Sequence, residues 1–150
     1  MSVMKLRSLV WGAISGTLGA VVMDLPMILQ REGSVPAFVA AGTASGQDPS
    51  DVSLRDAALA HHVAGALAGV LYAIFAAVTR TVLGERTAKI LAVSGVVLFI
   101  DAFFSKFVFP RFGGEAVADP ERASAVRAAW QRSAFVFGLA LWLFASKESR

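Results

Sequence analysis

The chain has no cysteine, one tyrosine and two histidines among 150 residues, and only 17% of its residues are charged. The absence of cysteine excludes disulfides, thiolate metal sites, iron–sulfur clusters and cysteine nucleophiles. P-loop, dinucleotide-binding and nucleophile-elbow motifs are also missing, because the glycine-rich segments lie inside apolar stretches. The sequence therefore assigns no catalytic residue and favours a protein that is not an enzyme.

Hydrophobic residues, in contrast, make up 56% of the chain and give it a mean hydropathy of +0.63. A helix needs about 20 apolar residues to cross the hydrocarbon of a bilayer, and four stretches approach or exceed that length. We predict an all-α integral membrane four-helix bundle, with residues 1–150 forming a single transmembrane domain. The predicted spans are residues 9–29, 59–79, 90–108 and 128–146.

The first span follows Lys5 and Arg7, as in a secretory signal. It is longer than a usual signal core, and Met23-Asp24-Leu25-Pro26 offers no small-x-small cleavage site, so we expect a retained span. Lys and Arg outside the spans slightly favour cytoplasmic N- and C-termini in a plasma (inner) membrane. The net charge of +3 is then expected to meet the lipid bilayer, not nucleic acid.

Breaker residues predict an outer loop over residues 31–56. Within it, Val35 to Ala41 fits a short interfacial or re-entrant turn or a loosely packed loop, of which the loop is favoured. Ser53 and Asp56 have capping-box spacing, which predicts a helix start near Leu54. Asp119-Pro120 predicts the start of the fourth helix, and Gly84 and Gly113-Gly114 mark helix exits.

Small residues predict where helices approach each other. Gly12 and Gly16 form one GxxxG motif, and Gly65 and Gly69 form another. We expect the first two spans to pack on each other through these faces; the alternative is a homodimer seam. Residues 13–16 resemble residues 92–95, so the chain is also consistent with a duplicated helical hairpin.

Polar residues within the spans are the candidates for function, because each costs about 2.5 kcal/mol or more if unpaired at the centre of a membrane helix. Counted from the cytoplasmic ends at ~1.5 Å per residue, four of them lie between about 21 and 26 Å up their helices, in one outer layer. These four are Asp24, His62, Lys106 and Arg132. Asp101 stands apart, about 16 Å up.

Two interpretations of this layer stay open. In the structural one, Asp24 pairs with Lys106 or Arg132, and the basic side chains extend toward the headgroups. In the functional one, the layer is a polar pocket in which His61 or His62 titrates near neutrality. Asp101 shares a helical face with Ser94 and Ser105, so its carboxyl is either hydrogen-bonded or one stage of a proton path.

Cofactors are not expected. His61 and His62 are adjacent and point about 100° apart, so they cannot ligate both sides of one haem within a monomer. No His or carboxylate recurs at metal-ligand spacing inside a span, so no metal site is predicted.

The small-residue first helix, the long outer loop, the residues His61, Gly69 and Tyr72, and the motif Phe109-Pro110-x-x-Gly113 resemble the YagU-type group of small multispanning inner-membrane proteins. The resemblance implies a plasma-membrane protein without enzymatic activity, connected with acid or envelope stress. The fourth helix lacks the Gly-His pair expected for that group, and no site residue is carried over.

Three functions remain as hypotheses. The first is a non-enzymatic accessory or assembly subunit of a membrane-protein partner, or a small homo-oligomer. The second is a proton-linked transporter or channel for a small solute, using Asp24, His62, Asp101 and Lys106. The third is a membrane enzyme acting on lipid or quinone at the outer polar layer.

Overall fold

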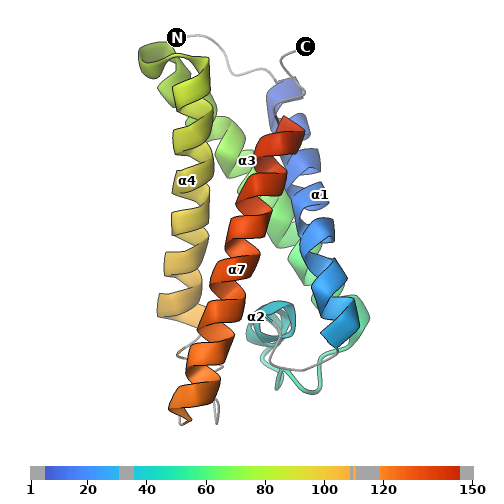
Figure 1. Cartoon of the computed structure of the whole chain (residues 1–150). Coiled ribbons are helices and arrows are strands. Elements are labelled where there is room, and N and C mark those ends of the chain that lie inside the picture. The colour runs from blue at the N-terminus through green and yellow to red at the C-terminus, as the bar shows by residue number, and fades with distance from the viewer. Residues whose placement is uncertain (1–5, 31–35, 109, 111–118, 146–150) are drawn as a thin grey trace.

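The computed structural model describes residues 6–30, 36–108, 110 and 119–145, and all regular secondary structure among them is helical. The elements are α1 (Leu6–Gln30), α2 (Pro36–Ser45), α3 (Leu54–Leu83), α4 (Glu85–Phe103), the π-helix η1 (Phe104–Val108) and α7 (Pro120–Ala145). The four long helices lie side by side, with α2 across one end (Figure 1). The prediction of an all-α fold is confirmed.

Four helical segments are long and apolar enough to cross a membrane: Leu6–Asp24, Leu54–Leu83, Glu85–Phe107 and Ala123–Ala145. Each overlaps one predicted span and begins before it. At ~1.5 Å per residue, the 30 residues of α3 measure about 45 Å, which exceeds the ~30 Å of a hydrocarbon core. The sequence therefore predicted the number of long helices but underestimated the length of the last three apolar segments.

The helix starts predicted near Leu54 and at Pro120, and the helix exit predicted at Gly84, agree with the structure. Ser53 caps α3: its hydroxyl accepts from the Asp56 amide at 3.1 Å and donates to the Asp56 carboxylate at 2.7 Å. Pro120 is the first residue of α7, and the Asp119 carboxylate accepts from the Glu121 amide at 3.0 Å. Gly84 alone connects α3 to α4, and its φ of 74° is the left-handed conformation that glycine tolerates. Gly113-Gly114 lies outside the described residues.

The prediction of a loosely packed loop over Val35 to Ala41 is wrong, because Pro36 to Ala41 is the start of α2. Ala37 and Ala41 lie one turn apart and pack against Val52 and Ala57 in a small buried cluster. The helix is thus stabilised by its contact with α3, which a local pattern of glycine and proline does not reveal.

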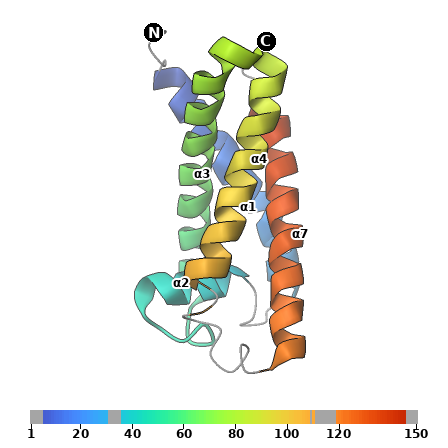
Figure 2. The same ribbon diagram turned by 90° about the vertical axis from the view of Figure 1, so that its left-hand side faces the viewer.

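The four long helices contact one another in a ring: α1 packs on α3 and α7, and α4 completes the ring by packing on the other side of α3 and α7 (Figures 1 and 2). Ala68, Tyr72, Val96, Phe137 and Leu141 form much of the buried core. Leu6 and Ala145 lie at the end of the molecule where α3 meets α4 (Figure 1). The helix η1, α2 and the start of α7 lie at the opposite end.

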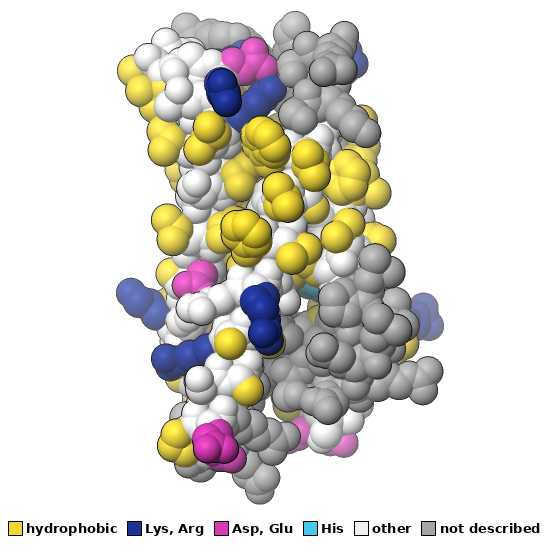
Figure 3. Space-filling model, in the orientation of Figure 1, with side chains coloured by type: hydrophobic (Ala, Val, Ile, Leu, Met, Phe, Trp, Pro, Cys, Tyr) yellow, Lys and Arg dark blue, Asp and Glu magenta, His cyan; other side chains and the backbone are white. Residues whose placement is uncertain are grey.

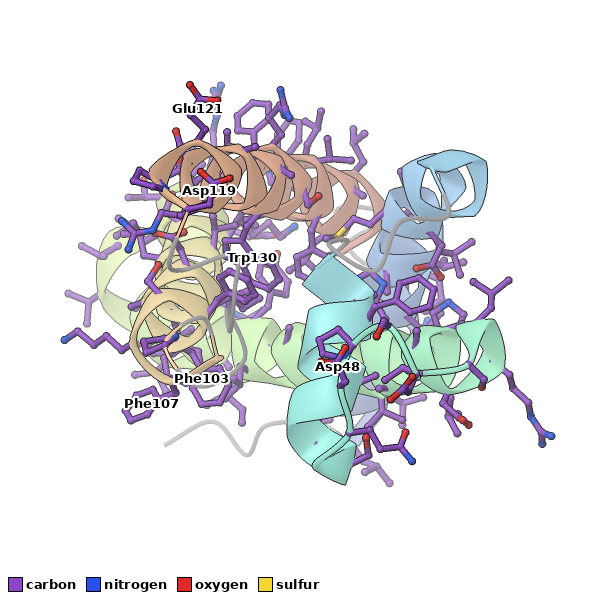
Figure 4. All side chains as sticks on the ribbon, turned by 90° about the horizontal axis from the view of Figure 1, so that it is seen from below. Asp48, Phe103, Phe107, Asp119, Glu121 and Trp130 are labelled. Atoms are coloured by element: carbon purple, nitrogen blue, oxygen red, sulfur yellow. The ribbon has the colours of Figure 1, made fainter. Side chains whose placement is uncertain are left out.

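The π-helix after α4 was not predicted. Phe104 at its start is 1% exposed and stacks on Trp130 of α7, with ring centroids 3.8 Å apart. Phe103 and Phe107 point away from the other helices, whereas Trp130 points inward (Figure 4). The wider turn of a π-helix changes which residues share a face beyond Phe103, so the α-helical spacing used for Ser105 no longer applies.

Candidate functional site

Asp24 of α1 is a buried carboxylate held between two histidines of α3. Its side chain is 9% exposed. Nδ1 of His61 lies 2.6 Å from Oδ1, and Nε2 of His62 lies 2.5 Å from Oδ2. Both separations are within hydrogen-bonding distance. We call these three side chains the Asp24 cluster.

Adjacent residues make this geometry possible. Side chains of consecutive helical residues diverge by about 100°, so two neighbouring rings can approach one carboxylate from two sides. The two rings differ in access to the surface: the His61 side chain is 16% exposed and that of His62 is 35% exposed. His62 is therefore the ring through which the cluster meets its surroundings.

Glycines bring α1 close enough to α3 for these contacts. A Cβ at Gly12 would lie 2.5 Å from the carbonyl oxygen of Gly69, and a Cβ at Gly16 would overlap the carbonyl oxygen of Gly65. The two backbones are thus in direct contact, as at GxxxG crossings. Asp24 lies two turns beyond Gly16, and His61 lies one turn before Gly65. The antiparallel register therefore places Ala57 opposite Asp24 and brings His61 to within one turn of it, where its ring reaches the carboxylate.

The Asp24 cluster is a continuous chain of hydrogen bonds. Each ring nitrogen contacts a different carboxylate oxygen, so one N–H of each ring can donate to Asp24. The cluster therefore links three ionisable side chains, from the buried His61 through Asp24 to the more exposed His62.

The other predicted site residues do not join the Asp24 cluster. Lys106 and Arg132 are exposed and make no ion pair with a described residue, so Asp24 has histidine partners instead of the expected Lys106 or Arg132. Asp101 is half-buried, and its side chain makes no hydrogen bond with Ser94, Ser105 or any other described residue. The expected layer of four polar residues is thus only partly brought together.

Metal binding finds no support in the part of the chain that the structure describes, where no group of three His, Asp or Glu side chains is arranged to hold an ion. In the Asp24 cluster the ring nitrogens and carboxylate oxygens instead contact each other directly.

An apolar band covers the face of the molecule that Figure 3 shows. Hydrophobic side chains cover α4 and α7 between charged side chains at the top and basic and acidic ones below (Figure 3). The colour of the histidines shows at the lower edge of this band, so the Asp24 cluster lies near the boundary between apolar and charged surface (Figure 3).

Comparison with known protein families, curated proteins and solved structures finds no match to this chain.

Proposed function

We propose that this chain is a multi-pass protein of the plasma membrane, a four-helix bundle with cytoplasmic termini, that moves protons together with a small solute or as a channel. The observation that carries the proposal is the Asp24 cluster, in which the last residue of the candidate span Leu6–Asp24 meets two histidines of the candidate span Leu54–Leu83. Ionisable residues within membrane-spanning segments mark ion and proton pathways in many membrane proteins.

Membrane insertion is supported by the outer surface of the helices. Large hydrophobic side chains are exposed along α1, α3, α4 and α7, and they form the apolar band of Figure 3. Soluble proteins rarely expose contiguous apolar surface on this scale.

The difference in exposure between the two rings gives the proton a route. A proton arriving from the outer polar surface meets His62 first, and Asp24 links that ring to the more buried His61. Histidine is suited to this exchange because its ordinary charge change lies near physiological pH.

The test measures proton flux in proteoliposomes that enclose a pH-sensitive dye, driven by a potassium diffusion potential. Asp24→Asn keeps a side chain that can hydrogen-bond both rings but cannot be ionised. We expect its flux to fall to that of empty vesicles. Asp51→Asn, an exposed carboxylate outside the long helices, is the matched control and should retain full flux. Equal flux in wild type and Asp24→Asn would contradict the proposal.

Topology is tested separately with single cysteines, which the natural chain lacks. Gln47→Cys and Thr87→Cys are both exposed, and they lie at opposite ends of α3. A membrane-impermeant maleimide applied to intact cells should label position 47 only, and position 87 should react after permeabilisation. Labelling of both in intact cells would contradict four crossings with cytoplasmic termini.

A second candidate function, an accessory subunit or small homo-oligomer, is favoured by one exposed surface. Phe99, Phe103 and Phe107 form a ladder on α4 and η1, with successive ring centroids 6.3 and 5.5 Å apart, and each is more than half exposed. Aromatic side chains are common at the centre of protein interfaces. Mass measurement in mild detergent tests this role: an oligomer or bound partner that is lost in Phe103→Ala would support it, and a lone monomer would count against it.

A further inference from the structure

A narrow apolar groove runs along the outside of the molecule between α4 and α7. Gly138 sets its floor, because a Cβ there would lie 2.6 Å from Cγ2 of Val97. The groove has a volume of about 290 Å³. Its walls include Ile90, Ser94, Val97, Phe135, Leu139 and Trp142.

The size of the groove limits what fills it. The wall residues on each helix extend over seven steps, or about 11 Å at 1.5 Å per residue. A helix with its side chains is about 10–12 Å across, so it would insert only single side chains into the groove. A single acyl chain, the other apolar occupant that a membrane offers, can lie along it.

The two ends of the groove differ in charge. Four residues before Ile90, the same face of α4 carries Arg86, which is exposed and has no acidic partner among the described residues. Glu85 points to another face and accepts a hydrogen bond from Lys89 at 2.7 Å. This end therefore presents an uncompensated cation in line with the groove.

At the other end, the two helices carry one acidic and one basic residue, which form no ion pair. Four residues beyond Val97, the groove face of α4 carries Asp101, and three residues before Phe135, α7 carries Arg132. Two contacts join the helices on either side of these residues: Phe104 stacks on Trp130, and Val97 lies against Gly138. Asp101 and Arg132 lie between these contacts along their helices, so they are at a similar level along the groove. The carboxylate of Asp101 disfavours the binding of an anion at this end of the groove.

We propose that the groove binds one acyl chain of an anionic membrane phospholipid whose phosphate contacts Arg86. The chain lies along the apolar walls, and the guanidinium of Arg86 supplies the bidentate fork that matches a phosphate. In the proposed topology Arg86 belongs to the cytoplasmic leaflet, where anionic lipids attract basic residues. The inference rests on the proposed membrane insertion and is independent of the proton-linked role.

Fluorescence quenching tests this site through Trp142, which lines the groove and is 42% exposed. In a Trp11→Phe, Trp130→Phe background, Trp142 is the sole tryptophan. The protein is reconstituted with brominated phosphatidylglycerol or brominated phosphatidylcholine, and the two quenching curves are compared. We expect phosphatidylglycerol to quench at about fivefold lower mole fraction, since one basic group near an anionic headgroup contributes about that factor.

Matched variants separate the site from general lipid contact. Arg86→Gln should abolish the preference, Arg132→Gln should leave it intact, and Ser94→Phe, which fills the groove, should lower quenching by phosphatidylglycerol. Equal quenching by both lipids, or a preference that depends on Arg132, would overturn the site. Quenching by brominated fatty acid at equally low mole fraction would overturn the choice of a phospholipid. No quenching by any brominated lipid would instead show that the chain is not in the membrane, and so would refute the proposed insertion.

Discussion

Replacing Gly69 by alanine perturbs the contact between α1 and α3 that brings the Asp24 cluster together. A Cβ at position 69 would overlap the carbonyl oxygen of Gly12, and it would lie 2.7 Å from that residue's carbonyl carbon and 2.9 Å from the amide nitrogen of Gly16. All three atoms belong to the backbone, so no side chain can rotate away. The helices must separate by several tenths of an ångström or more to reach ordinary contact distances.

Gly95→Ala on α4 is the matched control, because a Cβ there has no neighbour within 4 Å. Both substitutions raise helix propensity by about 1 kcal/mol, so their difference isolates the steric term. Overpacking typically costs about 1–3 kcal/mol, and we expect Gly69→Ala to be less stable than Gly95→Ala by that amount.

The free energy of unfolding is measured in mixed micelles by titrating a denaturing detergent and following helix content by circular dichroism. Gly69→Ala should also weaken the contacts of Asp24, which lies on the same side of α1. Equal unfolding midpoints for the two alanine variants would refute the close crossing, and with it the explanation of how Asp24 reaches the histidines.

Three further outcomes are expected. Ser53→Ala should lower stability by about 0.5–2 kcal/mol in the same unfolding assay, because the cap of α3 is lost; no change would contradict the capping contact. Phe104→Ala should cost about 3–5 kcal/mol, since this ring is buried against Trp130, and an unfolding midpoint close to wild type would contradict that packing. Hydrogen bonds from the Ser50 side chain and backbone lower the pKa of Asp48 below 3.8. The stability from this turn is therefore present above pH 3.8 and is lost as pH falls through the lowered pKa; an NMR titration should show the Asp48 midpoint rise in Ser50→Ala, and an unchanged midpoint would contradict it.

Much of the fold could be predicted because its signals are local. Apolar stretches of sufficient length revealed four long helices, and Ser53, Gly84 and Pro120 marked helix ends through chemistry that acts within one turn. The helix α2 could not be predicted in the same way. It is held by the contact of Ala37 and Ala41 with α3, and the sequence does not specify that contact locally.

The Asp24 cluster could have been predicted from the sequence, although the predicted ion-pair partner of Asp24 was Lys106 or Arg132. Placing Gly12 opposite Gly69 and Gly16 opposite Gly65 fixes the antiparallel register of the first two spans. Continued for two turns, that register brings Asp24 to within one turn of His61. The depth along each helix placed Asp24 and His62 in one layer with Lys106 and Arg132. Depth does not say which helices are neighbours, so it could not identify the partners of Asp24.

The face shared by Asp101 and Ser105 illustrates a limit of α-helical periodicity. The prediction assumed 3.6 residues per turn beyond Phe103, where the chain forms a π-helix. The stack of Phe104 on Trp130 depends on α7, which is far away in the sequence.

The central claim, that Asp24 is hydrogen-bonded to both histidines, is tested most directly by ¹⁵N NMR of histidine-labelled protein in bilayers. His61 and His62 are the only histidines, so every signal belongs to the cluster. We predict that the hydrogen-bonded nitrogens in wild type are Nδ1 of His61 and Nε2 of His62, and that the chemical shifts of both change in Asp24→Asn. Identical spectra for the two proteins would contradict the claim.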